Sequence, residues 1–190
     1  MGSKIKIAII DSGINRKLAQ VVKCENELIV DESNSCRLDF TKQQATDYSH
    51  GTICSLIIEK YCPECVFDSI RILDDKGKGY IERIVPALEW CIQNDIKIAN
   101  LSLGTTHFRD NEKLNKVINK YVNKGLIIVA AISNTGYFTS PASFTNVIGV
   151  ASKESYSLYV NDYHKRALWA GRSRTVMGDA SVRFTVCSFY

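Results

Sequence analysis

The stretch Ile5-Lys6-Ile7-Ala8-Ile9-Ile10-Asp11-Ser12-Gly13 decides the fold class of this chain. Its apolar residues form a short, β-branched run that ends at a turn-forming Asp-Ser-Gly sequence. This pattern is typical of a strand that is buried on both faces, as in parallel sheets covered by helices. We therefore predict a buried strand over residues 5–10, with Asp11 at its carboxyl end.

Strand and helix patterns alternate along the rest of the chain. We predict strands over 28–30, 66–73, 96–103, 126–131 and 146–151, and helices over 51–59, 81–94 and 111–123. In the last forty residues, only short strands are predicted, over 158–160, 167–169 and 183–186. The alternation favours an α/β fold, doubly wound, with a mostly parallel sheet and helices on both faces. Because no linker or repeat interrupts the pattern, we predict a single domain over 1–190.

The composition is that of an ordinary globular chain. Of the 190 residues, 45% are hydrophobic and 23% are charged, and the formal net charge is +4. The lysines and arginines are scattered, which indicates a solvated surface rather than a nucleic-acid-binding face. No apolar run approaches the roughly 18 residues of a membrane span, and no signal peptide precedes the first strand. We expect no nucleic-acid partner, no membrane and a cytoplasmic location.

The cysteines add to this expectation. Seven is an odd number, so at least one thiol stays unpaired. Only Cys62-Pro63-Glu64-Cys65 forms a pair motif, and one CxxC alone does not supply the four ligands of a structural zinc site. We expect reduced thiols, as in a cytoplasmic protein. A disulfide between Cys62 and Cys65 is the alternative, and a metal- or redox-sensing role for the pair is a third hypothesis.

Polar residues next to the predicted strands are candidates for chemistry, because ligands bind at the carboxyl ends of parallel strands. Asp11 follows the first strand, Ser102 lies near the end of another, and Asn134 follows the most apolar one. His50 begins a predicted helix. Taken separately, each of these residues has a plain structural explanation as a turn, cap or loop residue.

Taken together and in order, the motifs around these residues resemble those of the subtilase family of serine proteases. They are Asp11-Ser12-Gly13 after an apolar strand, His50-Gly51-Thr52, the segment 70–104 that closes with Ser102-Leu103-Gly104, the run 129–133 that leads into Asn134, and Ser140-Pro141-Ala142 with the strand that follows. The resemblance covers residues 5–152. It implies the subtilisin-like version of the α/β fold predicted above.

The resemblance also implies an activity, that of a serine endopeptidase acting on an extended peptide or protein through an acyl-enzyme. His50 would be the general base and then the general acid, Asp11 would fix its tautomer, and Asn134 would stabilise the oxyanion. The backbone of Ser102-Leu103-Gly104 would pair with the substrate strand. Ser133, which stands where the family has glycine, would narrow or polarise the primary specificity pocket.

The chain departs from the family pattern at the nucleophile. No Gly-Thr-Ser-Met-Ala-like motif is present, and the best candidate is Ser188 in Val186-Cys187-Ser188-Phe189-Tyr190. The helix that should follow this serine is missing. Three explanations are open: the C-terminal region is incomplete, a partner or separate segment completes it, or the chain is a degenerate relative. A degenerate relative would act as a peptide-binding or scaffolding protein.

Two expectations concern cofactors and substrate. Calcium commonly accompanies the family, but no ligand set can be matched to it residue by residue, so we predict neither a metal nor a cofactor. Small subtilases without an evident pro-segment resemble leader-processing peptidases. The resemblance therefore favours a processing protease.

Overall fold

The structure is a computed structural model and describes residues 4–40, 49–74, 76–133, 137–151, 175–177 and 187–188, the last two ranges by their backbone only. The strands are β1 (Lys6–Asp11), β2 (Cys24–Val30), β3 (Cys36–Leu38), β4 (Val66–Arg71), β5 (Ile98–Leu101), β6 (Leu103–Gly104), β7 (Ile127–Ala131), β8 (Ile148–Ala151), β9 (Thr175–Met177) and β10 (Cys187–Ser188). Eight of them form one sheet in the order β3-β2-β4-β1-β5-β7-β8-β9, and β6 pairs separately with β10. Neighbouring strands are parallel except β2 and β3.

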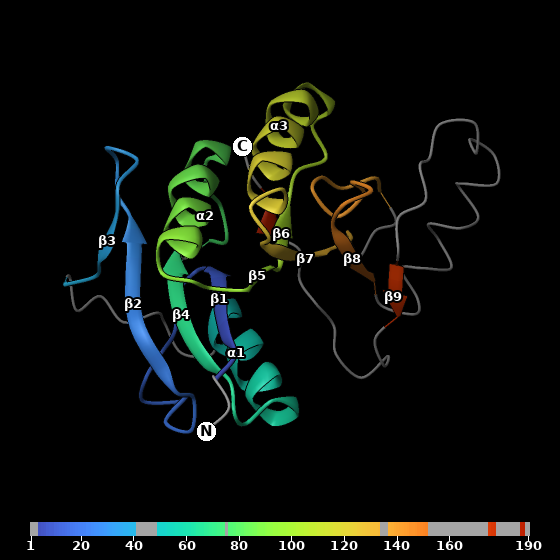
Figure 1. Cartoon of the computed structure of the whole chain (residues 1–190). Coiled ribbons are helices and arrows are strands. Elements are labelled where there is room, and N and C mark those ends of the chain that lie inside the picture. The colour runs from blue at the N-terminus through green and yellow to red at the C-terminus, as the bar shows by residue number, and fades with distance from the viewer. Residues whose placement is uncertain are drawn as a thin grey trace.

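The helices cover both faces of this sheet (Figure 1). The helix α1 (His50–Tyr61) lies on one face, and α2 (Ile84–Gln93) and α3 (Asn111–Val122) lie on the other. The two latter helices follow the short 3₁₀ turns η1 (Ile81–Arg83) and η2 (Phe108–Asp110). This arrangement confirms the predicted α/β fold with a mostly parallel sheet.

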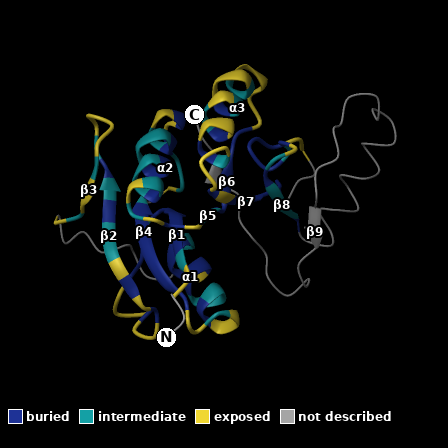
Figure 2. Cartoon of the chain, in the orientation of Figure 1, coloured by how far each residue is buried: buried dark blue, intermediate teal, exposed yellow. Residues whose placement is uncertain are grey.

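Two apolar cores lie on the two faces of the sheet, and β1 contributes to both. Figure 2 shows that β1 is a buried strand. Ala8 and Ile10 pack in the core that includes α2 and α3, whereas Ile7 and Ile9 pack in the core that includes α1. Successive side chains of a strand point to opposite faces, so a strand in this central position needs apolar residues throughout. The opening stretch of the sequence has this property, which confirms the prediction for β1.

The predicted strand over 96–103 is divided in the structure. Strand β5 ends at Leu101, and β6 begins at Leu103 with a different partner, β10. Ser102, between them, is buried and turns its hydroxyl group toward α1, where Cys54 contacts it. The pairing of β6 depends on a segment more than eighty residues away, which a local pattern does not reveal.

Other differences lie near the ends of the chain. Strands β3, β9 and β10 were not predicted from the sequence. The predicted strands over 158–160, 167–169 and 183–186 lie outside the described residues. In the parts of the chain that the structure describes, no helix has the length and apolar character to cross a bilayer. The assignment of one domain to 1–190 stays a prediction.

The α1 face of the sheet carries half-buried apolar side chains beyond α1 itself. They come from three neighbouring strands and are Ile98, Val129, Ile148 and Val150. The register places Ile98 opposite Ile127, which is 47% exposed, and Val129 opposite Ile148. A cavity of about 140 Å³ opens here between α1 and the strands β5, β7 and β8.

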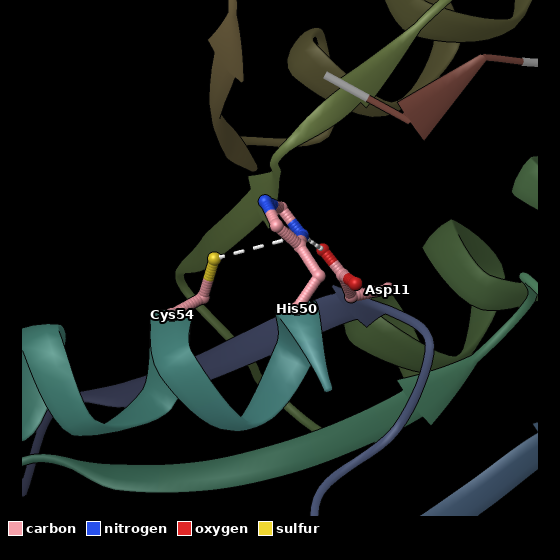
Figure 3. A group of neighbouring side chains, drawn as sticks. All are labelled: Asp11, His50 and Cys54. Atoms are coloured by element: carbon pink, nitrogen blue, oxygen red, sulfur yellow. Dashed lines mark hydrogen bonds and ion pairs between the residues drawn. The ribbon is translucent and has the colours of Figure 1, made fainter. Parts of the chain in front are cut away.

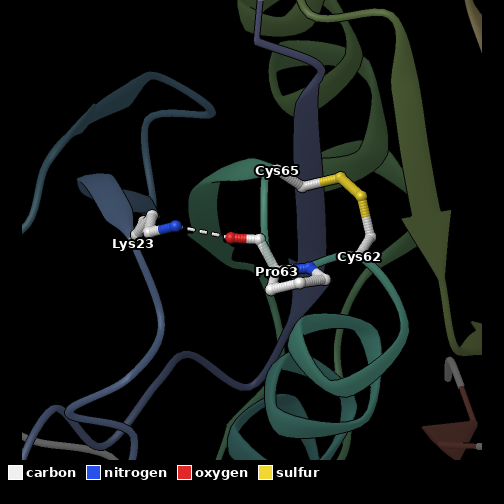
Figure 4. Close-up of a disulfide and its surroundings, with 4 residues drawn as sticks. All are labelled: Lys23, Cys62, Pro63 and Cys65. Carbon is white, nitrogen blue, oxygen red and sulfur yellow. Dashed lines mark hydrogen bonds between the residues drawn. A yellow bond between two sulfur atoms is a disulfide. The ribbon is translucent and has the colours of Figure 1, made fainter.

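A disulfide joins Cys62 and Cys65 where α1 ends and the chain turns into β4 (Figure 4). Their Cα atoms lie 5.6 Å apart, which is an ordinary separation for a disulfide. The expectation of reduced thiols is therefore wrong for this pair, and the alternative is confirmed. Lys23 donates a hydrogen bond from Nζ to the Pro63 carbonyl inside the bridged loop. The free cysteines among the described residues are Cys24, Cys36, Cys54 and Cys91.

Candidate active site

Asp11 is the last residue of β1 and its side chain is completely buried. Its carbonyl oxygen accepts hydrogen bonds from the backbone N–H groups of Ile72 and Leu73, which follow β4. Its Oδ1 atom accepts a hydrogen bond from the Ser12 backbone N–H at 2.7 Å. These hydrogen bonds fix both the backbone and the carboxylate of Asp11. The second carboxylate oxygen, Oδ2, faces α1.

His50 is the first residue of α1, and the preceding Ser49 caps the helix. The Ser49 hydroxyl accepts a hydrogen bond from the Thr52 backbone N–H, as an N-cap serine does. The Thr52 hydroxyl in turn accepts a hydrogen bond from the Asn15 backbone N–H at 2.8 Å. The start of α1 is therefore tied to the loop that follows β1, the loop that Asp11 begins.

Gly51 allows α1 to approach this loop closely. A Cβ atom at this position would overlap the carbonyl oxygen of Gly13 and would lie 3.2 Å from the Asp11 Cβ. The Gly51 backbone N–H also donates a hydrogen bond to the Ser12 hydroxyl at 3.2 Å. The His-Gly-Thr motif therefore needs glycine for packing. A larger residue at this position would hold α1, and with it His50, farther from Asp11.

The result of this packing is a direct hydrogen bond between the two side chains (Figure 3). The Nδ1 atom of His50 donates to Oδ2 of Asp11 at 2.8 Å. The His50 side chain is 16% exposed and the Asp11 side chain 0%. Figure 3 shows the other ring nitrogen, Nε2, pointing away from Asp11. The carboxylate thus fixes the tautomer in which Nε2 can accept a proton.

The surroundings of His50 change its pKa in opposite directions. Burial is the largest single influence and lowers the pKa, because it penalises the imidazolium. The hydrogen bonds and charge interactions with Asp11 and Cys54 outweigh burial and raise the pKa of His50 from 6.5 to about 10. The pair therefore stabilises the imidazolium strongly, as a catalyst that forms this ion during its reaction requires.

Cys54 is a member of the site that the motifs did not indicate. It lies one helical turn after His50, it is buried, and its sulfur is 3.9 Å from the His50 Nδ1 atom. Its thiol donates a hydrogen bond to the Ser102 hydroxyl, which also accepts one from the Asn100 side-chain amide at 3.0 Å. The i, i+4 spacing from His50 was the available signal, because such residues share one helix face.

The segment predicted to pair with a substrate backbone does form a strand edge. Leu103 and Gly104 make up β6, which pairs in parallel with β10 so that Gly104 lies opposite Ser188. A Cβ atom on Gly104 would come within 2.8 Å of the Ser140 carbonyl oxygen. This edge accepts an extended segment, and in the structure that segment is Cys187–Ser188 of the chain itself.

The structure describes less of the remaining predicted site residues. Ser188 lies in β10 and not at the start of a helix, and its side chain is outside the described residues. Asn134 is also outside the described residues. Ser133 is buried directly beyond β7, where its backbone N–H donates a hydrogen bond to the Thr139 hydroxyl. The roles of these three residues stay predictions.

Known sequences resemble this chain over most of its length. A family model described as the subtilase family matches residues 2–185. The chain is 30% identical over 163 residues to the minor extracellular protease Epr of Bacillus subtilis, which is 80% of this chain and 24% of that protein. It is 30% identical over 176 residues to thermitase of Thermoactinomyces vulgaris, which is 83% of this chain and 60% of thermitase.

Comparisons with solved structures give the same fold. Sphericase matches with a TM-score of 0.63 at 24% identity, over 80% of this chain and 54% of sphericase. The nisin leader peptidase NisP from Lactococcus lactis matches with a TM-score of 0.60 at 17% identity, over 82% of this chain and 57% of that structure. The chain thus spans between about a quarter and three fifths of the length of these relatives.

Proposed function

Because the chain belongs to the subtilase family, we propose that it is a serine endopeptidase whose Asp11 and His50 activate a serine toward an extended peptide. The observation that carries this proposal is the 2.8 Å hydrogen bond from the His50 Nδ1 atom to the buried Asp11 carboxylate. A serine hydroxyl is a weak nucleophile until a neighbouring base accepts its proton. The geometry around His50 leaves Nε2 available for this task.

The proposed reaction proceeds through an acyl-enzyme. The Nε2 atom of His50 takes the proton of the serine hydroxyl while the serine oxygen attacks the carbonyl carbon of the scissile bond. Asp11 stabilises the imidazolium that forms. The imidazolium then gives its proton to the nitrogen of the leaving amine as the C–N bond breaks. A water molecule, deprotonated by the same Nε2 atom, hydrolyses the remaining ester.

The nucleophile of this proposal is Ser188, and the oxyanion donor is Asn134. A substrate strand on β6 requires β10 to leave this edge, and its departure releases Ser188 from its pairing with Gly104. The same edge would then bind the substrate by strand addition, with the backbone of Leu103 and Gly104 as partners. The parallel pairing with β10 supports this role, because it shows an extended segment bound there.

A further part of the proposal concerns the half-buried face described above. A helix supplied by a partner, or by another segment of the protein, would cover the apolar side chains of β5, β7 and β8 beside α1. The half-buried state of Ile98, Val129 and Val150 and the adjacent cavity of about 140 Å³ support this. Each Å² of apolar surface removed from water there is worth about 25 cal/mol.

The finer proposal for the substrate is a precursor peptide that a processing protease cleaves. It is motivated by the fold shared with the nisin leader peptidase and with the epidermin leader peptide processing serine protease EpiP from Staphylococcus aureus, which matches with a TM-score of 0.61. A cytoplasmic location also stays a proposal, and the Cys62–Cys65 disulfide does not support it, because disulfides are rare in the cytosol.

One observation favours a second candidate function. Ser188 lies in a strand and not at the start of a helix, where the family resemblance expects the nucleophile. A chain that binds an extended peptide along β6 without cleaving it would fit this arrangement. Such a protein would act in peptide binding or scaffolding.

Turnover and binding of a fluorogenic peptide library distinguish the two functions. For the peptidase we expect cleavage that is lost in Ser188→Ala and in His50→Ala. Ser181→Ala, a second serine of the same C-terminal region, serves as the matched control and should retain cleavage. Peptide affinity without turnover, unchanged in Ser188→Ala, would establish the binding function and reject the peptidase.

A further inference from the structure

We propose that Asp11, His50 and Cys54 together form a site for one Zn²⁺ ion, and that the bound ion switches the peptidase off. The three side chains offer a carboxylate oxygen, an imidazole nitrogen and a thiol sulfur that all lie within 4.8 Å of one another (Figure 3). The existence of the site is independent of the activity, whereas its inhibitory effect rests on the proposed function.

Two of the three separations between the ligand atoms lie within about half an ångström of those in a tetrahedral zinc site. Bond lengths of 2.0–2.1 Å to nitrogen and oxygen and 2.3 Å to sulfur place neighbouring ligand atoms about 3.3–3.5 Å apart. In the structure, the His50 Nδ1 atom is 2.8 Å from the Asp11 oxygen and 3.9 Å from the Cys54 sulfur. Shifts of about half an ångström bring both atoms to zinc-binding separations from Nδ1. The three ligand atoms lie within 4.8 Å of one another, so the Asp11 oxygen and the Cys54 sulfur must also approach each other by up to about 1.3 Å.

The charges of the three ligands suit a buried divalent ion. Asp11 and Cys54 have almost no exposed surface, so an unbalanced charge between them would be costly. A carboxylate, a thiolate and a neutral imidazole carry two negative charges in total, which one Zn²⁺ ion neutralises. The Cys54 thiol loses its proton to solvent when the metal binds.

A second shell of hydrogen bonds is already in place. The Ser102 hydroxyl contacts the Cys54 sulfur at 3.4 Å, and its oxygen also accepts a hydrogen bond from Asn100. Once the thiol is deprotonated, the Ser102 hydroxyl can rotate and donate its own hydrogen to the thiolate. On the other side, the Ser12 backbone N–H holds the Asp11 carboxylate. Outer groups of this kind orient metal ligands and raise affinity.

The site borders the cavity of about 140 Å³ on the α1 face, because Cys54 and Ser102 both line it. This volume is larger than the volume that several water molecules occupy in liquid water. Of the three ligands, Cys54 lines the cavity. The cavity therefore gives access to the Cys54 sulfur and room for water as a fourth ligand, as in zinc sites with three protein ligands. A thiolate ligand selects zinc over calcium or magnesium, which prefer oxygen ligands.

The inhibitory effect follows from which nitrogen of His50 the ion occupies. A neutral imidazole that binds zinc through Nδ1 carries its proton on Nε2. Nε2 then has no lone pair to accept the proton of the serine hydroxyl, so the general base is removed. The ion also replaces the hydrogen bond between His50 and Asp11. The Asp11 oxygen and the His50 Nδ1 atom therefore cannot serve the metal and the reaction together.

Metal binding is tested on the full chain with Co²⁺ and Zn²⁺. The control is Cys36→Ser, which changes a half-buried free cysteine in β3, away from the site. We expect one Co²⁺ per chain with a thiolate-to-cobalt charge-transfer band in the wild type and in Cys36→Ser, and no such band in Cys54→Ser. Competition with a chromophoric chelator should show zinc affinity weakened in Cys54→Ser by more than the roughly 10–100-fold that loss of an outer-shell partner costs.

A wild-type chain without the charge-transfer band would overturn the proposal, and this result does not depend on how Cys54→Ser folds. Inhibition is measured separately, with each variant compared with its own metal-free rate. Zinc should inhibit cleavage by the wild type and by Cys36→Ser but not by Cys54→Ser. Stoichiometric thiolate binding in a chain that cleaves no peptide would reject the proposed function and leave the zinc site established. Cleavage that persists with zinc bound would reject the switch.

Discussion

Asp11→Asn is the change that tests the electrostatics of the site most sharply. The substitution keeps the shape of the side chain and removes its negative charge. In the wild type, the carboxylate and Cys54 together raise the pKa of His50 to about 10, against a burial effect that lowers it. Since burial and the contact with Cys54 both remain when the charge is gone, we expect the pKa of His50 to fall clearly below 10.

The assay is an NMR titration of the imidazole ring protons. The chain has three histidines, so the His50 resonance is assigned by its absence in His50→Gln. Asp95→Asn, which removes an exposed carboxylate, is the matched control and should leave the His50 titration unchanged. A pKa that stays near 10 in Asp11→Asn would refute the assignment of the carboxylate as the cause.

The same interaction predicts a pH dependence of stability. A folded-state pKa above the unfolded value means that the folded chain holds the proton more tightly. The resulting stabilisation is complete below pH 6.5 and is lost as the pH rises toward about 10. Urea denaturation should therefore show the wild type losing stability across this range, and Asp11→Asn losing much less. Cleavage, which needs a neutral His50, should increase over the same range.

Three further predictions concern the stability of the fold. Gly51→Ala introduces a methyl group that would overlap the carbonyl oxygen of Gly13, so it should lower the free energy of unfolding by about 1–3 kcal/mol; an unchanged urea midpoint would contradict the packing argument. Cys62→Ser opens a four-residue loop and should lower the free energy of unfolding by about 2 kcal/mol in the chain-entropy description. A wild type whose melting temperature does not change with a reductant would contradict the disulfide. Tyr121→Phe removes a hydroxyl that donates to Glu89 at 2.7 Å and should cost about 1 kcal/mol in the same denaturation assay; a variant as stable as the wild type would show that this bond adds nothing.

The parts of the structure that could be predicted from the sequence are those that local patterns determine. The residues of β1 are apolar on both sides because the strand is buried on both faces, so the sequence predicted the strand and its burial. Asp11 and His50 lie at the ends of a strongly patterned strand and helix. Their short motifs therefore predicted their positions, and the structure confirms that the two side chains meet.

The parts that could not be predicted depend on contacts between distant segments. Strands β9 and β10 have three and two residues, which are too few to show a hydrophobic pattern. Their partner strands, β8 and β6, lie far away in the sequence. The spacing of Cys62 and Cys65 allowed both a reduced and an oxidised state, and the bond between them is found only in the structure. Cys54 shares a helix face with His50, but its contact with Ser102 requires the fold.

The measurement that tests the central claim most directly is labelling with a serine-directed fluorophosphonate, followed by mass spectrometry of the labelled chain. The account predicts that the folded wild type is labelled at Ser188 and that His50→Ala is not labelled, because the serine then has no base. A folded wild type in which no serine reacts would contradict the claim that Asp11 and His50 activate a serine in this protein.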